Sequence, residues 1–123
     1  MSFDSMISAP PPPAAGTRLA LLQGTLDLLI LRTLQNQARH GWSIMERIEE
    51  LSHGLLQVNQ GSIYPALHRL ENQGWVRAGW RISELGRRAR YYTLTPAGRR
   101  QLEAETSNWQ RFSAAVGWIL QEG

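Results

Sequence analysis

The sequence contains no cysteine and no lysine. Without cysteine the chain can form no disulfide bond, bind no metal through a thiolate and use no cysteine nucleophile. Without lysine, all thirteen cationic side chains are arginine. Arginine carries a planar, fork-shaped guanidinium that suits phosphate groups and guanine edges better than a point-like ammonium does. Genome composition alone would explain the absence of lysine equally well, but in either case every cation of this chain is of the type that suits nucleic acid.

The sequence also lacks a long uninterrupted apolar run. The longest candidate, residues 19–34, is broken by Gln23, Asp27 and Arg32, whereas a helix that crosses a bilayer needs about 20 consecutive, mostly apolar residues. The first eight residues carry one charge, on Asp4, and so lack the positive and then apolar order of a signal peptide. We therefore expect a cytoplasmic protein without a membrane partner.

The common catalytic and metal-binding motifs are absent as well. There is no phosphate-binding glycine loop, no nucleophile elbow and no His-Glu zinc helix. His40, His53 and His68 lie on separate segments without the spacing of metal ligands. We therefore expect no metal, no cofactor and no enzymatic activity.

The start of the chain is rich in proline, with one run that covers residues 10–13. Proline removes backbone hydrogen-bond donors and disfavours helix in the residue before it, so residues 1–17 are expected to form a disordered tail. The remaining length suits one small domain.

Apolar spacing predicts three helices before residue 75. Residues 25–34 are apolar on nearly all sides, which indicates a central or shared helix, and residues 41–51 follow a helical period. The third helix begins between Asn59 and Ser62, both good N-cap types, and ends at Gly74. Its expected buried stripe is Ile63, Ala66, Leu67 and Leu70. Its expected outward face is Gly61, Pro65, His68 and Asn72, with Ser62 and Arg69 on the flank.

Two strands and a long last helix complete the prediction. Residues 75–80 and 90–94 hold aromatic and β-branched residues on either side of a loop that contains Gly86. Thr95 and Pro96 then supply a helix N-cap and a first helical position. The predicted fold is mainly α with a small β-hairpin. It is a winged helix-turn-helix DNA-binding domain over residues 18–95, followed by a C-terminal dimerisation helix over residues 96–123.

Positive charge is concentrated in the third helix and the hairpin. From Asn59 to Arg100 eight arginines oppose only Glu71 and Glu84, which gives this segment a net charge of +6 while the whole chain carries +3. Such a block is the electrostatic signature of a surface that binds a polyanion. The third helix can enter a DNA major groove about 12 Å wide, and arginines of the hairpin can reach neighbouring phosphates.

The candidate DNA-binding residues follow from this arrangement. They are Asn59, Gln60, Ser62, Tyr64, Pro65, His68, Arg69, Arg87, Arg88, Arg90 and Tyr92. Arg87 and Arg88 could instead belong to an ordinary solvated turn, and His68 could be a plain surface residue. Strand alternation turns one of the adjacent residues Tyr91 and Tyr92 into the core. The alternative function is a dimeric winged-helix interaction module whose basic face binds a protein or RNA.

Four stretches resemble the PadR family of bacterial transcriptional regulators. They are LLQGTLDLLILRTL, HGWSIMERI, QGSIYPALHRLENQGWV and RRARYYTLTPAGRRQL. The resemblance extends from about Leu21 to Leu102, and its most specific part is Ile63 to Leu70. The single C-terminal helix is similar to the smaller PadR subfamily, in a form abundant in acidobacterial genomes. The resemblance implies a repressor that binds palindromic double-stranded DNA as a homodimer, with Tyr64 and the arginine-rich wing in contact with DNA.

A dimer interface is expected along the first and last helices, whose apolar surface exceeds what one small core can cover. Its predicted residues are Leu22, Leu26, Leu102, Trp109, Phe112, Val116 and Ile119, most of which follow a heptad repeat. Trp109 also resembles a tryptophan that stacks planar ligands at the dimer centre of multidrug-responsive small members. Trp109 and Phe112 are therefore candidate contacts for a small aromatic effector. The alternative, which the helix pattern alone favours, is that Trp109 is a plain core residue of the dimer.

Overall fold

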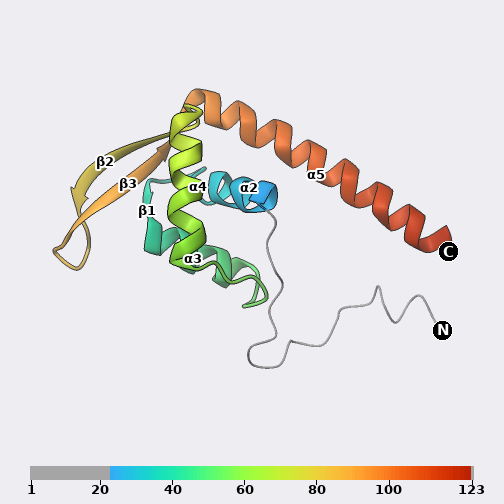
Figure 1. Ribbon diagram of the computed structural model, residues 1–123, viewed down its shortest axis with the longest axis horizontal. Coiled ribbons are helices and arrows are strands. Elements are labelled where there is room, and N and C mark those ends of the chain that lie inside the picture. The colour runs from blue at the N-terminus through green and yellow to red at the C-terminus, as the bar shows by residue number, and fades with distance from the viewer. Residues whose placement is uncertain (1–22, 123) are drawn as a thin grey trace.

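The computed structural model describes residues 23–122, with four helices and three strands in that range (Figure 1). The predicted tail over residues 1–17 and the predicted dimer residue Leu22 lie outside the described residues. The elements follow the order α2 (Gln23–Thr33), β1 (Arg39–His40), α3 (Gly41–Leu51), α4 (Gln60–Asn72), β2 (Val76–Ile82), β3 (Arg88–Leu94) and α5 (Pro96–Glu122). Within the described range, no helix is long and apolar enough to cross a membrane.

The sheet is small and antiparallel, in the order β1-β3-β2. β2 pairs with β3 from Val76 opposite Leu94 to Ile82 opposite Arg88, and the two strands extend from the body as a wing (Figure 1). Both strands run further toward the tip than their residue types predicted. The short strand β1, which pairs with Tyr91 and Tyr92, was not predicted, because a strand of two residues has no repeating pattern.

Helix α4 begins and ends where its capping residues predicted. The side chain of the N-cap Asn59 accepts a hydrogen bond from the backbone N–H of Ser62 at 3.0 Å. Gly74, just beyond the C-cap, has a φ of 77°, a left-handed conformation that favours glycine. The apolar stripe of α4 is buried as expected and consists of Ile63, Ala66, Leu67 and Leu70.

Three helices and the base of the wing enclose one apolar core. Ile30 and Leu31 of α2 and Ile44 of α3 meet the buried stripe of α4, and all of these side chains are fully buried. Val76, Tyr92 and Leu94 close the core from the sheet. The arrangement is the predicted winged helix-turn-helix with one additional long helix.

The start of α5 is fixed tightly to the body. The Thr95 hydroxyl accepts a hydrogen bond from the Gly98 N–H at 3.0 Å and donates one to the Gly74 carbonyl at 2.7 Å. A Cβ on Gly98 would lie 2.0 Å from the carbonyl oxygen of Trp75, so only glycine fits there. The first turns of α5 pack on α2 and β3, and the rest of the helix projects away from the body on the side opposite to the wing (Figure 1).

Two predicted dimer residues lie in the core of the single chain. Leu26 of α2 is 5% exposed and Leu102 of α5 is 4% exposed. Both belong to the core cluster of the single chain, so neither offers surface to a second copy. The heptad pattern identified both side chains as apolar but could not say which surface covers them. The other described seam residues, Trp109, Phe112, Val116 and Ile119, are exposed.

Candidate nucleic-acid interface

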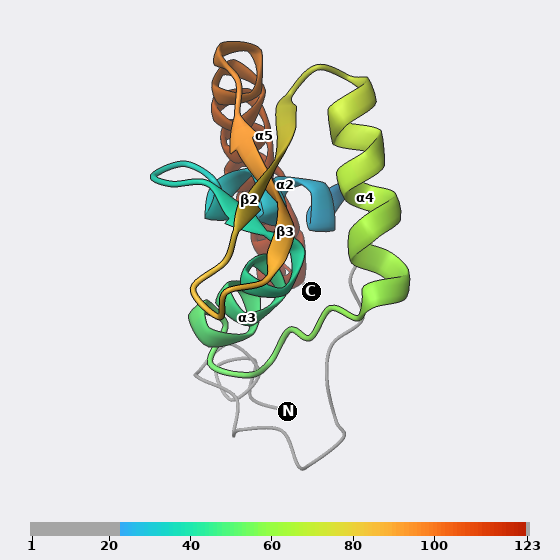
Figure 2. The same cartoon turned by 90° about the vertical axis from the view of Figure 1, so that its left-hand side faces the viewer.

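The outward surface of α4 is polar and open. The exposed residues are Gln60, Gly61, Ser62, Tyr64, Pro65, His68 and Asn72, of which the helical period predicted Gly61, Pro65, His68 and Asn72 as the outward face. The N-cap Asn59 is exposed as well. Helix α4 and the wing lie side by side on the face that Figure 2 turns toward the viewer. A helix with an exposed polar surface and an arginine-rich hairpin are therefore available on one face.

Tyr64 is held in place by the start of α3. A Cβ on Gly41 would lie 2.8–2.9 Å from three atoms of the Tyr64 ring and hydroxyl, so the ring packs directly on the glycine backbone. Tyr64 still exposes 46% of its surface. An aromatic side chain with a fixed ring and an exposed edge suits contact with DNA, since its hydroxyl can donate to a phosphate oxygen.

A polar cleft of about 400 Å³ separates α4 from the wing. Its lining residues are Tyr64, His68, Glu71, Asn72, Arg90 and Tyr92. Arg90 Nη2 donates to Glu71 Oε2 at 3.0 Å across the cleft, which ties the wing to α4. This bond uses part of the donor capacity of Arg90, one of the predicted DNA contacts. It also neutralises Glu71, whose charge would otherwise repel phosphate.

Tyr92 does not have the exposure that a direct DNA contact requires. It is only 6% exposed and belongs to the core, and burial raises the pKa of its hydroxyl. Its neighbour Tyr91 points to the opposite face of the sheet, as strand alternation requires. Tyr92 packs in the core and also lines the polar cleft, so its low exposure argues against the direct DNA contact that the sequence predicted.

Arg69 has a partner within the chain that the sequence did not predict. Its Nη2 donates to Asp27 Oδ1 of α2 at 2.9 Å, and its buried Nε has no hydrogen-bond partner within the described residues. Arg69 therefore lies on the flank of α4 that packs on α2, apart from the outward face with Tyr64 and His68. In this arrangement it positions α4, whereas the sequence predicted that it reaches DNA.

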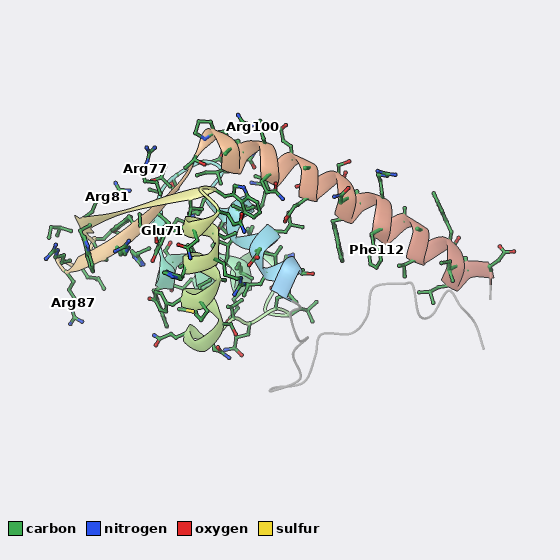
Figure 3. All side chains as sticks on the ribbon, turned by 45° about the horizontal axis from the view of Figure 1, so that its top comes forward. Glu71, Arg77, Arg81, Arg87, Arg100 and Phe112 are labelled. Atoms are coloured by element: carbon green, nitrogen blue, oxygen red, sulfur yellow. The ribbon has the colours of Figure 1, made fainter. Side chains whose placement is uncertain are left out.

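The wing presents cations on both of its faces. Arg88 lies over the Trp80 ring with its guanidinium carbon 4.7 Å from the ring centroid, and the register places Arg90 on the same face, toward α4. Arg81 lies over the Tyr91 ring at 4.3 Å on the other face. Arg87 is exposed at the tip (Figure 3). The sequence pattern indicated Arg87, Arg88 and Arg90 but not Arg77 and Arg81. The pairing of β2 with β3 places these last two arginines together on one face of the wing.

Most arginines of the basic block lack a carboxylate partner. Within residues 23–122 the ion pairs join Arg47 to Glu50, Arg69 to Asp27 and Arg90 to Glu71. The arginines of the block without such a pair are Arg77, Arg81, Arg87, Arg88, Arg99 and Arg100. Unpaired guanidinium groups at this density favour a polyanionic partner.

The three histidines lie on different segments of the fold. His40 is the N-cap of α3, where its Nδ1 accepts a hydrogen bond from the Ser43 N–H at 3.1 Å, and His68 lies on the outward face of α4. His53 follows α3. Over residues 23–122 no three His, Cys, Asp or Glu side chains come together in a way that could hold a metal ion.

The candidate effector residues lie on the projecting part of α5. The ring centroids of Trp109 and Phe112 are 6.3 Å apart, and the two residues are 47% and 63% exposed. Figure 3 shows Phe112 on the part of α5 that projects from the body. Within one chain they form an open aromatic pair on a helix surface. Such a pair can contact either a second copy or a flat ligand.

Known proteins share this sequence pattern and fold. Residues 30–104 match the model of the Transcriptional regulator PadR-like family. A transcriptional regulator of Mycobacterium tuberculosis is 44% identical over 88 residues, which cover 72% of this chain and 70% of that protein. The crystal structure of a PadR-like transcriptional regulator from Bacillus cereus has 31% identity and a TM-score of 0.70, and the match covers 81% of this chain and 95% of that one.

A PadR family transcription regulator from Clostridium difficile is also similar, with 26% identity and a TM-score of 0.68 over 77% of this chain and 97% of that one. The family model covers more than half of the chain, and it includes α3, α4 and the wing, which form the polar, cationic face. The resemblance that the four sequence stretches predicted is confirmed. The chain belongs to the PadR-like family of transcriptional regulators and is a DNA-binding regulator rather than an enzyme.

Proposed function

We propose that the chain is a homodimeric repressor that binds a palindromic operator in double-stranded DNA, in the cytoplasm where that DNA lies. The observation that carries the proposal is the position of α4 beside the wing (Figure 2), together with the exposed polar face of α4 and the exposed wing residues Arg87 and Arg88, which form no ion pair with another described residue. Helix α4 enters the major groove, where His68 and Asn72 face the base edges. Arg87 and Arg88 of the wing bind phosphates.

The dimer follows from the exposed seam of α5. Trp109, Phe112, Val116 and Ile119 are between 37% and 71% exposed and recur at heptad spacing on a helix that projects beyond the body. A contiguous apolar surface of this kind favours pairing with a copy of itself about a two-fold axis. Such pairing would set two copies of α4 about one DNA turn, roughly 34 Å, apart, which matches a palindrome.

Repression requires only that the bound dimer occupies DNA that the polymerase must use. The interface of α4 and the wing together with the α5 seam are sufficient for this. The exposed pair of Trp109 and Phe112 would then lie at the dimer centre. A flat aromatic effector that inserts beside these rings would change the angle between the two α5 helices and relieve repression.

Operator binding is the experiment that tests the function. Genomic fragments that the protein retains would identify the operator, and fluorescence anisotropy would compare its affinity with that of random duplex. A sequence-specific regulator prefers its operator by about three orders of magnitude or more. His68→Ala should relax the preference at one position of each half-site. Arg87→Ala and Arg88→Ala should weaken binding to both duplexes. They should also reduce the slope of log affinity against log salt concentration by about one for each phosphate that is no longer bound.

Arg32→Ala is the matched control, because Arg32 is exposed on α2 and lines a hollow with Arg99 and Leu102, apart from the outward face of α4. It should leave both affinities unchanged. Equal affinity for the enriched fragments and for random duplex would contradict the proposal. Salt-sensitive binding of RNA or of a protein in place of duplex DNA would instead favour an interaction module.

A further inference from the structure

The wing has a second cationic surface on the face that points away from α4. Strand pairing places Arg77, Gly79 and Arg81 of β2 on that face, opposite Thr93, Tyr91 and Ala89 of β3. Their neighbours Val76, Tyr92 and Leu94 point to the other face and are buried in the core. Arg77 and Arg81 are both exposed. These two cations therefore cannot take part in the cleft between α4 and the wing.

Arg81 is held in a fixed position on this face. Its guanidinium carbon lies 4.3 Å from the centroid of the Tyr91 ring, and the Tyr91 ring stands edge-on to His40 at 5.2 Å. His40 is itself fixed as the N-cap of α3. A guanidinium that lies over an aromatic ring keeps its N–H groups available to an anion and loses less conformational freedom when it binds one.

A hollow of about 420 Å³ lies between the two arginines. It is lined by Arg77, Gly79, Arg81, Tyr91 and Thr93, together with parts of Ala78 and Trp80. Because Gly79 has no side chain, the floor of the hollow is open backbone. The Thr93 hydroxyl at its edge is a further possible donor to an anion. Arg77 and Arg81 are separated by about 13 Å along the strand, so they would contact different phosphates of one backbone.

The cationic surface continues onto the last helix. Figure 3 shows Arg81, Arg77 and Arg100 one after another in space from the wing to the start of α5, with Glu71 of α4 on the other side of the wing. All three arginines are exposed, and none forms an ion pair with another described residue. We call Arg77, Arg81 and Arg100 the dorsal row. The dorsal row is a stripe of unpaired charge that faces away from the operator-binding side.

We propose that the dorsal row binds the phosphate backbone of duplex DNA that flanks the operator. The proposal rests on the proposed function, in which α4 occupies a major groove and the wing lies at the edge of the half-site. DNA that continues past the wing and curves toward the body would reach Arg81 first, then Arg77 and Arg100. Contacts of this kind carry no sequence information, so they would add affinity without altering the preferred operator.

The test compares a short operator duplex with the same operator extended by about 20 base pairs, or two helical turns, on each side. The intact chain should bind the extended duplex about fivefold or more tightly, and the salt slope should steepen by about 0.9 for each additional phosphate that is bound. A duplex of equal length without the operator corrects for non-specific sites. The double variant with Arg77→Ala and Arg81→Ala should lose the increase in affinity from extension while its affinity for the short operator stays unchanged.

A second double variant, with Arg77→Ala and Arg100→Ala, leaves the stack of Arg81 on Tyr91 intact and should also lose most of the increase. Arg99→Ala is the matched control, because Arg99 is the exposed neighbour of Arg100 but lines a hollow with Arg32 and Leu102 on the α2 side. It should retain the increase.

Three outcomes would overturn the inference: no increase from extension in the intact chain, an increase that survives in both double variants, or an equal loss of affinity on the short operator. The last outcome would make the dorsal row part of the operator interface itself. Failure of the intact chain to prefer the operator at all would contradict the proposed function, and this result is visible separately on the short duplex.

Discussion

The ion pair between Arg69 and Asp27 allows a sharp prediction, because burial and attraction act in opposite directions on it. Burial raises the pKa of the Asp27 carboxyl above its ordinary value of 3.8, and the hydrogen bond and charge of Arg69 lower it without offsetting the rise. The ionised carboxylate is therefore less favourable in the folded chain than in the unfolded chain. The ionised Asp27 carboxylate therefore lowers the free energy of unfolding at pH 7, as is common for the charges of buried pairs.

The sign of the pH dependence follows from this shift. Between pH 3.8 and the raised pKa, the folded chain binds more protons at Asp27 than the unfolded chain does. The contribution of Asp27 to stability is therefore greatest below this window and decreases as the pH rises through it. Asp27→Asn removes the charge but keeps an oxygen that accepts from Arg69, so the free energy of unfolding at pH 7 should change by less than about 1 kcal/mol.

Arg69→Met should be more harmful, because it leaves the Asp27 carboxylate partly buried without a donor. Asp27 and Arg69 side chains are 17% and 36% exposed, so solvent screens part of the loss, and we expect about 1–2 kcal/mol at pH 7. The loss should shrink as the pH falls through the raised pKa of Asp27 toward 3.8, since the folded carboxyl then becomes neutral. Combining Asp27→Asn with Arg69→Met should recover part of the loss.

Urea unfolding at pH 7 and pH 4, followed by circular dichroism, measures these free energies. If Asp27→Asn cost as much as Arg69→Met at pH 7, the attraction would outweigh desolvation and the reasoning would be wrong. Operator binding supplies an independent check. Arg69→Met should preserve the base preference at every position, whereas relaxed preference at one position would show that Arg69 leaves Asp27 and contacts a base.

Three further predictions concern the last helix. Gly98→Ala should destabilise the fold by about 2 kcal/mol or more in urea unfolding because its Cβ meets the Trp75 carbonyl, while Gly117→Ala, where no atom lies within 4 Å of the new Cβ, should be neutral or stabilising. Truncation after Ser107 keeps the core residue Leu102 but removes the exposed seam of α5. The shortened chain should sediment as a monomer and bind the operator with greatly reduced affinity. An intact chain that sediments as a monomer at micromolar concentration would refute the dimer. Flat aromatic dyes should quench the emission of a variant whose only tryptophan is Trp109, and an absence of saturable quenching would favour a closed core.

The sequence predicted the helices well because their ends are encoded locally. Asn59 and Thr95 cap the starts of α4 and α5, and Gly74 ends α4 in a left-handed conformation. The buried stripe of α4 follows from the helical period alone. The wing was predicted in the correct place but too short, although the alternation of polar and apolar residues continues through Arg81 and Ile82 of β2 and through Arg88 and Ala89 of β3.

The sequence could not predict which surface covers each apolar side chain. Leu26 and Leu102 continue the apolar pattern of exposed residues such as Trp109, yet they are buried in the core of the same chain. A helical period identifies the side of a helix that avoids water but not the element that shields it. The packing of α5 on α2 depends on contacts between elements at opposite ends of the described range, which no local pattern records.

The same limit applies to the arginines, and it determines which of them remain available to DNA. In the sequence, the cations from Asn59 to Arg100 form one block with a net charge of +6. In the fold, two carboxylates divide that block. Asp27 of α2 pairs with Arg69 of α4, and Glu71 of α4 pairs with Arg90 of the wing. The cations near α4 therefore hold the helix in position. The unpaired cations lie on the wing and at the start of α5, on both faces of the sheet. This division supports the proposal that the wing binds phosphates, because α4 is left with a nearly neutral face of amide, hydroxyl and imidazole groups, the types that distinguish bases by hydrogen bonding.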